Sequence, residues 1–140
     1  MTKKMIFLVL LAAHAPASAQ LWLPYWYSRD YTYLYDPTSV TRSESVARVE
    51  TLRNNNGVAV AGNGKQYLST TTTEEIDCQS QTSKITYMTS WTGSDGRGEA
   101  IYSFATGDDE GKAIPSGTII WELYSILCEK YAAHTSEQAQ

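Results

Sequence analysis

Hydrophobic and polar residues alternate along much of the chain with the period of two that is typical of β-strands. Five segments carry this pattern and are predicted as strands: 31–35, 43–53, 65–78, 82–92 and 99–105. A weaker extended piece covers 58–60. Turn-forming residues separate these segments at 54–57, 62–64 and 93–96. The pattern therefore predicts several antiparallel strands joined by short turns.

Two of the segments allow finer predictions. In 43–53, Val46, Val49 and Leu52 recur at a spacing of three, which a helix would also produce. The β-branched residues and the Asn-Asn-Asn-Gly sequence that follows favour a strand that ends in a turn at 54–57. In 82–92, the alternation is expected to place four side chains on one face of the strand: Ile85, Tyr87, Thr89 and Trp91.

The last predicted element is a helix over 118–133. Its apolar residues follow the spacing of a single helix face: Ile119, Leu123, Ile126 and Leu127. Thr118 suits the N-cap position, and Glu122 lies near the positive end of the helix dipole. One helix that follows several antiparallel strands can cover one face of their sheet, so the sequence predicts an α+β fold.

The first 19 residues have the three parts of a signal peptide: a basic start, an apolar run at 5–13 and small residues at 17–19. The alternative is a buried N-terminal helix, which Pro16 disfavours. We therefore expect cleavage after Ala19 and export to the periplasm or the cell surface. Because Gln20 and not cysteine follows the cleavage site, we expect no lipid anchor.

These boundaries divide the chain into a signal peptide (1–19), an aromatic-rich N-terminal segment (20–32), a folded domain (33–133) and a disordered tail (134–140). The chain has 11 basic and 15 acidic residues, and loss of two lysines with the signal peptide leaves the mature protein at a net charge of −6. This acidic balance argues against nucleic-acid binding. No apolar run reaches the roughly 18 residues that a membrane-spanning helix needs.

The chain has two cysteines, Cys78 and Cys128. In an exported protein they are expected to form a disulfide, and the alternatives are a metal site or a reactive thiol. Their wide separation does not match the spacing of zinc ligands, which favours the disulfide. The closed loop of about 51 residues corresponds to about 4 kcal/mol of stabilisation in the chain-entropy model. Because one cysteine ends a predicted strand and the other lies in the predicted helix, the bond would join sheet and helix.

Candidate catalytic groups are few. The histidine that remains after signal cleavage, His134, lies in the predicted tail, which argues against Ser-His-Asp or Cys-His catalysis. Glu75 and Asp77 share a strand face and form a candidate acid-base pair, but a solvated pair beside a structural cysteine is favoured. The acidic loop 107–111 lacks the spacing of a calcium loop, and the glycines of 93–98 lack a phosphate-loop lysine. We expect no enzyme activity, metal or cofactor.

The aromatic segment before Asp36 is the most informative feature for binding. Four of its residues precede the first predicted strand: Trp22, Tyr25, Trp26 and Tyr27. Tyrosine and tryptophan are enriched at interfaces because they bury a large area at low entropic cost. These four residues are therefore candidates for an exposed binding surface or a dimer contact. The alternative is that they pack into the core or onto the helix, and the sequence leaves both open.

Several short motifs follow one another between Tyr33 and Glu129. They are Tyr35-Asp36 with Ser39-Val40 and Arg42, Gln-Tyr-Leu-Ser at 66–69, Glu-Ile-Asp-Cys at 75–78, Gly-Arg-Gly-Glu at 96–99, Ile-Pro-Ser-Gly-Thr at 114–118, and Glu122-Leu123 with Leu127-Cys128. This ordered set, with both cysteines in place, resembles the surface-adhesin protein E-like family of Gram-negative bacteria.

The resemblance implies a six-stranded antiparallel sheet packed against one C-terminal helix and held by a Cys78–Cys128 disulfide. It also implies a non-enzymatic envelope protein, in dimeric form, that binds host matrix or plasma proteins. The chain differs from the family pattern because it lacks the lipid-attachment cysteine. A small exported domain also suits a second hypothesis, a periplasmic inhibitor or accessory subunit that binds an endogenous envelope protein.

Overall fold

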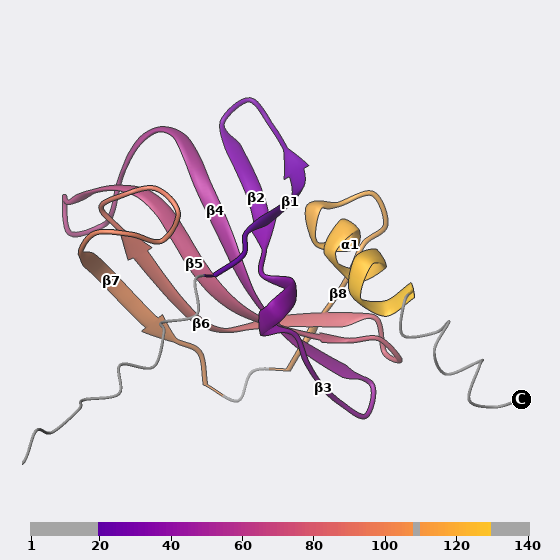
Figure 1. The fold of residues 1–140 in the computed structure, drawn as a ribbon. Helices are drawn as coiled ribbons and strands as arrows, with labels where there is room; N and C mark the ends of the chain where they lie inside the picture. The colour runs from indigo at the N-terminus through magenta and orange to yellow at the C-terminus, as the bar shows by residue number, and fades with distance from the viewer. Residues whose placement is uncertain (1–19, 108–109, 130–140) are drawn as a thin grey trace, which may run out of the picture.

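The computed structural model describes residues 20–107 and 110–129, so the predicted signal peptide and tail lie outside the described residues. Within this part, a single twisted sheet carries one helix near its end (Figure 1). The strands are β1 (Leu23–Tyr27), β2 (Tyr31–Tyr35), β3 (Thr41–Ser43), β4 (Val46–Val60), β5 (Gln66–Asp77), β6 (Thr82–Trp91), β7 (Ala100–Ala105) and β8 (Lys112–Ala113). The helix α1 (Ile119–Tyr124) continues into a short π-helix, η2 (Ser125–Glu129), and a 3-10 helix, η1 (Pro37–Ser39), follows β2.

The main path of the sheet runs in the order β1-β2-β4-β5-β6-β7, and the short strands β3 and β8 pair with β4 and β6. All the pairs are antiparallel. The central strand β5 contains an unbroken run of threonines at 70–73, and these β-branched side chains suit a pleated strand with neighbours on both sides. The predicted α+β fold, with one C-terminal helix on an antiparallel sheet, is confirmed.

The hydrophobic core lies beneath the helix at one end of the sheet. Its buried residues come from β4, β5, the helix and the loop before it: Ala47, Val49, Ile76, Ile114, Leu123, Leu127 and Cys128. The helix begins as predicted, because the Thr118 hydroxyl accepts a hydrogen bond from the backbone N–H of Trp121 at 3.4 Å. The described helix ends at Glu129, and the rest of the predicted helix lies outside the described residues.

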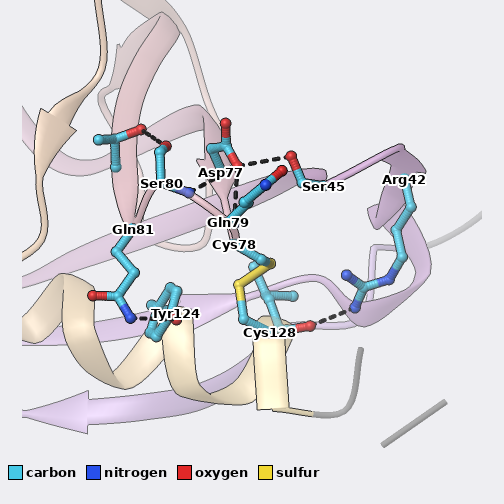
Figure 2. The surroundings of a disulfide bond; sticks show 11 residues. Arg42, Ser45, Asp77, Cys78, Gln79, Ser80, Gln81, Tyr124 and Cys128 are labelled. Atoms are coloured by element: carbon cyan, nitrogen blue, oxygen red, sulfur yellow. Dashed lines mark hydrogen bonds between the residues drawn. A yellow bond between two sulfur atoms is a disulfide. The ribbon is translucent and has the colours of Figure 1, made fainter. Parts of the chain in front are cut away.

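The Cys78–Cys128 disulfide joins the end of β5 to η2, as Figure 2 shows. The two Cα atoms are 5.5 Å apart, and 50 positions separate the residues along the chain. Two hydrogen bonds tie the same region together. The Arg42 guanidinium donates to the Leu127 carbonyl at 2.7 Å, and the Gln81 amide donates to the Tyr124 hydroxyl at 3.2 Å (Figure 2). The disulfide is therefore one of several links between the helix and the sheet.

The predicted turn at 54–57 is wrong, because β4 continues through it to Val60 with a bulge between Asn54 and Ala59. The asparagine side chains bond to distant loops instead of folding the chain back locally. The Asn54 amide donates to the Asp95 carboxylate at 2.7 Å, and Asn54 Oδ1 accepts from the Asp95 backbone N–H at 2.9 Å. The Asn56 amide donates to the Arg29 carbonyl at 2.7 Å.

The strand β6 does not keep Ile85 on the face expected from the alternation. The pairing with β5 shifts by one residue between Thr73 and Glu74, so that Glu74 pairs with Ile85 while Thr73 pairs with Tyr87. A shift of one residue moves a side chain to the other face of the sheet. Ile85 therefore points to the helix side, and Tyr87 remains on the opposite face.

The aromatic N-terminal segment does not precede the sheet but forms its edge strand, β1, which pairs with β2. The register shifts between Pro24 and Trp26, which places Tyr25 at an irregularity in the strand. The tight connection to β2 is closed by a hydrogen bond from the Ser28 backbone N–H to the Tyr31 carbonyl at 2.9 Å. The Tyr25 side chain therefore lies on the face of the sheet that carries the helix, where it packs against the core.

Candidate functional site

An open groove of about 620 Å³ lies between α1 and the face of the sheet that the helix leaves uncovered. Its walls are largely aromatic and aliphatic and include Tyr25, Trp26, Tyr33, Met88, Ile119 and Ile120. Two neighbouring hollows, of about 380 and 540 Å³, share lining residues with it, and Met88 lines all three. We call the 620 Å³ hollow the sheet groove. Its volume and apolar lining are typical of binding pockets.

The groove exists because the helix is much shorter than the strands beneath it. The six residues of α1 extend about 9 Å, whereas the 12 residues of β5 extend about 40 Å. Along β5, Ile76 lies under the helix in the core, while Thr70, Thr72 and Glu74 on the same face line the groove. The sheet face therefore changes from apolar core to open groove along a single strand.

A cluster of tyrosines forms the wall of the groove on the β1–β2 side. The Tyr25 ring lies 6.2 Å from the Tyr33 ring in a tilted arrangement and 6.1 Å from the Tyr35 ring in an edge-to-face arrangement. Of the predicted binding residues, Tyr25 and Trp26 line the groove and are partly buried. Trp22 is partly buried outside the lining, and Tyr27 is 69% exposed. The structure therefore brings two of the four together in one cavity.

Glu74 is the carboxylate of the groove, and the sequence reasoning did not identify it. Burial raises its pKa to about 7, since an apolar environment disfavours the charged form. Burial, together with the charge of Glu74, also raises the pKa of Tyr25 well above its ordinary value. Within the described part of the chain, the Glu74 side chain has no hydrogen bond or ion pair. The available signal was its alternation with Thr70, Thr72 and Ile76 on one strand face.

Arg53 and Glu74 lie at opposite ends of the groove in the direction of the strands. Arg53 of β4 pairs with Thr70 of β5, whereas Glu74, four residues further along β5, pairs with Val49. Its guanidinium carbon lies 4.9 Å from the centre of the Tyr31 ring, a cation–π contact. Its Nε atom is buried without a hydrogen-bond partner among the described residues. The Arg53 guanidinium, the cation that lines the groove, therefore already interacts with the ring of Tyr31.

Glu75 and Asp77, the candidate acid-base pair for which a solvated structural role was favoured, lie on the face opposite to Glu74. The Glu75 carboxylate makes ion pairs with Arg48 and Lys84, each at 3.7 Å. The Asp77 carboxylate accepts hydrogen bonds from the Ser45 hydroxyl at 2.8 Å and from the backbone N–H groups of the following turn (Figure 2). The Ser45 bond is the main cause of a lowered pKa at Asp77. Both carboxylates thus have structural partners.

The remaining candidate sites do not bring reactive side chains together in the part of the chain that the structure describes. The glycine-containing segment 93–98 is a turn, closed by a hydrogen bond from the Gly93 backbone N–H to the Arg97 carbonyl at 2.9 Å. In the described part of the chain, no three His, Cys, Asp or Glu side chains gather to hold a metal ion. His134 and two acids of the loop 107–111 lie outside the described residues. No helix of the described part is long and apolar enough to cross a membrane.

Three comparisons place this fold among known proteins. The model of the family "Surface-adhesin protein E" matches residues 22–129. A structure of protein E from Haemophilus influenzae superimposes with a TM-score of 0.55 at 15% identity, covering 80% of this chain and 93% of that one. A second crystal form gives a TM-score of 0.56 at 15% identity, with 82% and 99% coverage.

Protein E from non-typeable Haemophilus influenzae gives a TM-score of 0.55 at 15% identity, and covers 81% of this chain and 85% of that chain. No curated protein matches the chain significantly. The structural likeness shows a shared fold, and the family model spans most of the described residues. The chain therefore belongs to the surface-adhesin protein E family.

Proposed function

We propose that this chain is an exported, non-enzymatic protein of the bacterial envelope that binds another protein through the sheet groove. The observation that carries the proposal is an open, aromatic-lined groove of about 620 Å³ in a member of an adhesin family. Aromatic side chains in such grooves supply much of the binding energy of protein interfaces. The structural partners of Glu75 and Asp77 favour binding over catalysis.

The binding surface comprises the groove-lining residues Tyr25 and Trp26, extended along the edge of the sheet by Trp22 and the exposed Tyr27. The partner is a host matrix or plasma protein, which is the kind of ligand that the resemblance to the adhesin family implies. The edge strand β1 also offers its outer backbone groups to a second copy of the chain, which gives a route to a homodimer. The signal peptide directs the mature chain to the periplasm or the cell surface.

The test is a binding measurement on the mature protein, from Gln20 onward, against purified host matrix and plasma proteins. We expect saturable binding to at least one of them, and a loss of at least tenfold in affinity in the double variant Tyr25→Ala, Trp26→Ala. The matched control is Tyr87→Ala, since Tyr87 is an exposed aromatic on the opposite sheet face. Equal binding by the double variant and the control would contradict the groove as the binding surface.

The second candidate function is a periplasmic inhibitor or accessory subunit that uses the same groove on an endogenous envelope protein. A small domain whose helix is linked to its sheet by a disulfide suits the oxidising periplasm equally well. Protease treatment of intact cells separates the two functions. Digestion of the protein on intact cells supports the adhesin, whereas protection until the outer membrane is opened supports the periplasmic role.

A further inference from the structure

We propose that one corner of the sheet groove, formed by Tyr25, Trp26, Tyr33 and Glu74, binds the ammonium group of a lysine side chain presented by the protein partner. This inference rests on the proposed function, since it names the chemistry that the groove recognises. It is carried by an aromatic wall and by a carboxylate that has no hydrogen-bond or ion-pair partner among the described residues, and both line the same cavity.

The aromatic wall supplies the first half of the site. The Tyr25 and Tyr33 rings lie 6.2 Å apart, and Trp26 lines the same cavity. The faces of tyrosine and tryptophan rings attract cations through the ring quadrupole, and the attraction strengthens when water is excluded. Arg53, which lines the groove, already makes this kind of contact with the Tyr31 ring, at 4.9 Å. No cation of the described chain takes the equivalent place beside Tyr25.

Glu74 supplies the second half of the site, and it differs from the other acids of the neighbouring strands. The Glu50 carboxylate accepts a hydrogen bond from the Thr73 hydroxyl at 2.8 Å, and Glu75 has two ion pairs. Asp77 is held by the Ser45 hydroxyl and by backbone N–H groups. Among the described residues, the Glu74 side chain has no such partner. A partly buried carboxylate without a partner in the described chain is destabilising, and an arriving cation would offset that cost.

None of the charged side chains around this corner makes an ion pair with Glu74 in the described part of the chain. From β4, Arg53 is engaged on Tyr31, and from β6, Lys84 lies 3.7 Å from Glu75. Lys112 and Glu110 line the adjoining 380 Å³ hollow, which Glu74 also borders. From β1 and β2, the titratable neighbours are the hydroxyls of Tyr25 and Tyr33. Lys84 and Lys112 thus line the hollow next to this corner, but among the described residues no cation makes an ion pair with Glu74.

Size and charge favour a lysine of a protein partner as the occupant. The 620 Å³ of the groove exceeds the volume of a single side chain, so the residues that flank the lysine also fit. The mature chain, with 9 basic and 15 acidic residues, has a net charge of −6, which steers a basic surface toward it. A lysine side chain has a long apolar stem that packs along Met88, Ile119 and Ile120 while its ammonium reaches the carboxylate.

The test titrates the mature protein with Nα-acetyl-lysine methylamide while NMR follows the Trp26 indole signal. Nα-acetyl-norleucine methylamide, which has a similar stem and no charge, serves as the control probe. We expect saturable shifts with the lysine probe and at least tenfold weaker binding of the norleucine probe. Equal binding of the two probes, or the absence of shifts at Trp26, would overturn the inference without any variant.

A matched pair of variants places the effect at Glu74. We expect Glu74→Gln to weaken binding of the lysine probe at least tenfold, and Glu75→Gln, on the opposite face, to leave it unchanged. Unchanged binding in Glu74→Gln would overturn the inference. If a host protein binds and Glu74→Gln leaves that affinity intact, the lysine site fails while the proposed function stands. If the lysine probe binds as described but no host protein does, the proposed function fails and the site remains.

Discussion

The two ends of one sheet face differ in what covers them. At the end near Cys78, the sheet carries Val49 and Ile76 beneath the helix, and the disulfide fixes that helix in place. Toward the other end, the same face carries Thr70, Arg53 and Met88 and lies open as the sheet groove. The covered end therefore concentrates the stability of the domain, which leaves the open end available for binding.

Among the variants considered, loss of the disulfide at the covered end is expected to lower the free energy of unfolding most. The double variant Cys78→Ser, Cys128→Ser should lower the free energy of unfolding by about 4 kcal/mol, the chain-entropy value for a loop of about 51 residues. Urea unfolding of the variant and of the wild type under oxidising conditions measures the difference. A loss below about 1 kcal/mol would mean that the remaining contacts hold the helix without the disulfide.

A pair of leucine and isoleucine truncations compares the two ends directly. Leu123 is 0% exposed in the core, and Leu123→Ala should cost about 3 kcal/mol because it leaves a cavity. Ile120 lines the open groove, so Ile120→Ala should cost about 1 kcal/mol, since water already reaches that side. Chemical denaturation measures both variants. Equal losses would contradict the difference between the covered and the open end.

The pH dependence of stability reports on Glu74. Its pKa is raised from 4.5 to about 7 in the folded protein, so its stabilising contribution is complete below pH 4.5 and is lost as the pH rises through 7. Because the side chain is only partly buried, we expect a loss of about 2 kcal/mol between pH 5 and pH 8. Urea unfolding across this range should show that loss in the wild type and not in Glu74→Gln.

Asp77 provides a control of opposite sign for the same measurement. Its folded pKa is lowered, so its contribution is present above the unfolded pKa of 3.8 and is lost as the pH falls through the folded value. Asp77→Asn should therefore alter stability at neutral pH and leave the slope between pH 5 and pH 8 unchanged. A wild-type profile without a slope in that range would contradict the environment assigned to Glu74.

The smallest expected effect is at the surface ion pairs of Glu75. Glu75→Gln removes two contacts of 3.7 Å with partly exposed partners, so the free energy of unfolding should change by less than about 0.5 kcal/mol. Thermal unfolding at low and at physiological salt measures this change. A larger loss that disappears with salt would show that these charges act as a network across β4, β5 and β6.

The sequence was sufficient to predict the parts of the fold that depend on local pattern. The alternation located β5, β6 and β7, and the Thr118 cap located the start of the helix. The cysteine pair and the ordered motifs predicted the disulfide and the family. The strands and the helix start depend on residues that are close together in the sequence. The disulfide could be predicted because two cysteines allow only one pairing.

The features that were not predicted depend on distant contacts. The strand β4 passes through the expected turn because Asn54 bonds to Asp95, 41 positions away. The shift beside Glu74 moves Ile85 to the other face, and alternation alone contains no sign of it. The groove itself follows from how little of the sheet the helix covers, which no local pattern specifies. The sequence does not distinguish Glu74 from Glu75 and Asp77 on the other face, because its partial burial depends on where the helix lies on the sheet.

The most direct test of the groove as the binding surface is amide hydrogen exchange on the mature protein, free and bound to its captured partner. We predict that protection on binding is confined to the β1–β2 edge, to Met88 in β6 and to Ile119 and Ile120 at the start of α1. Tyr87 and its neighbours, on the opposite face, should exchange as in the free protein. Protection of the Tyr87 face with an unchanged groove would contradict the division of the sheet into a stable end and a binding end.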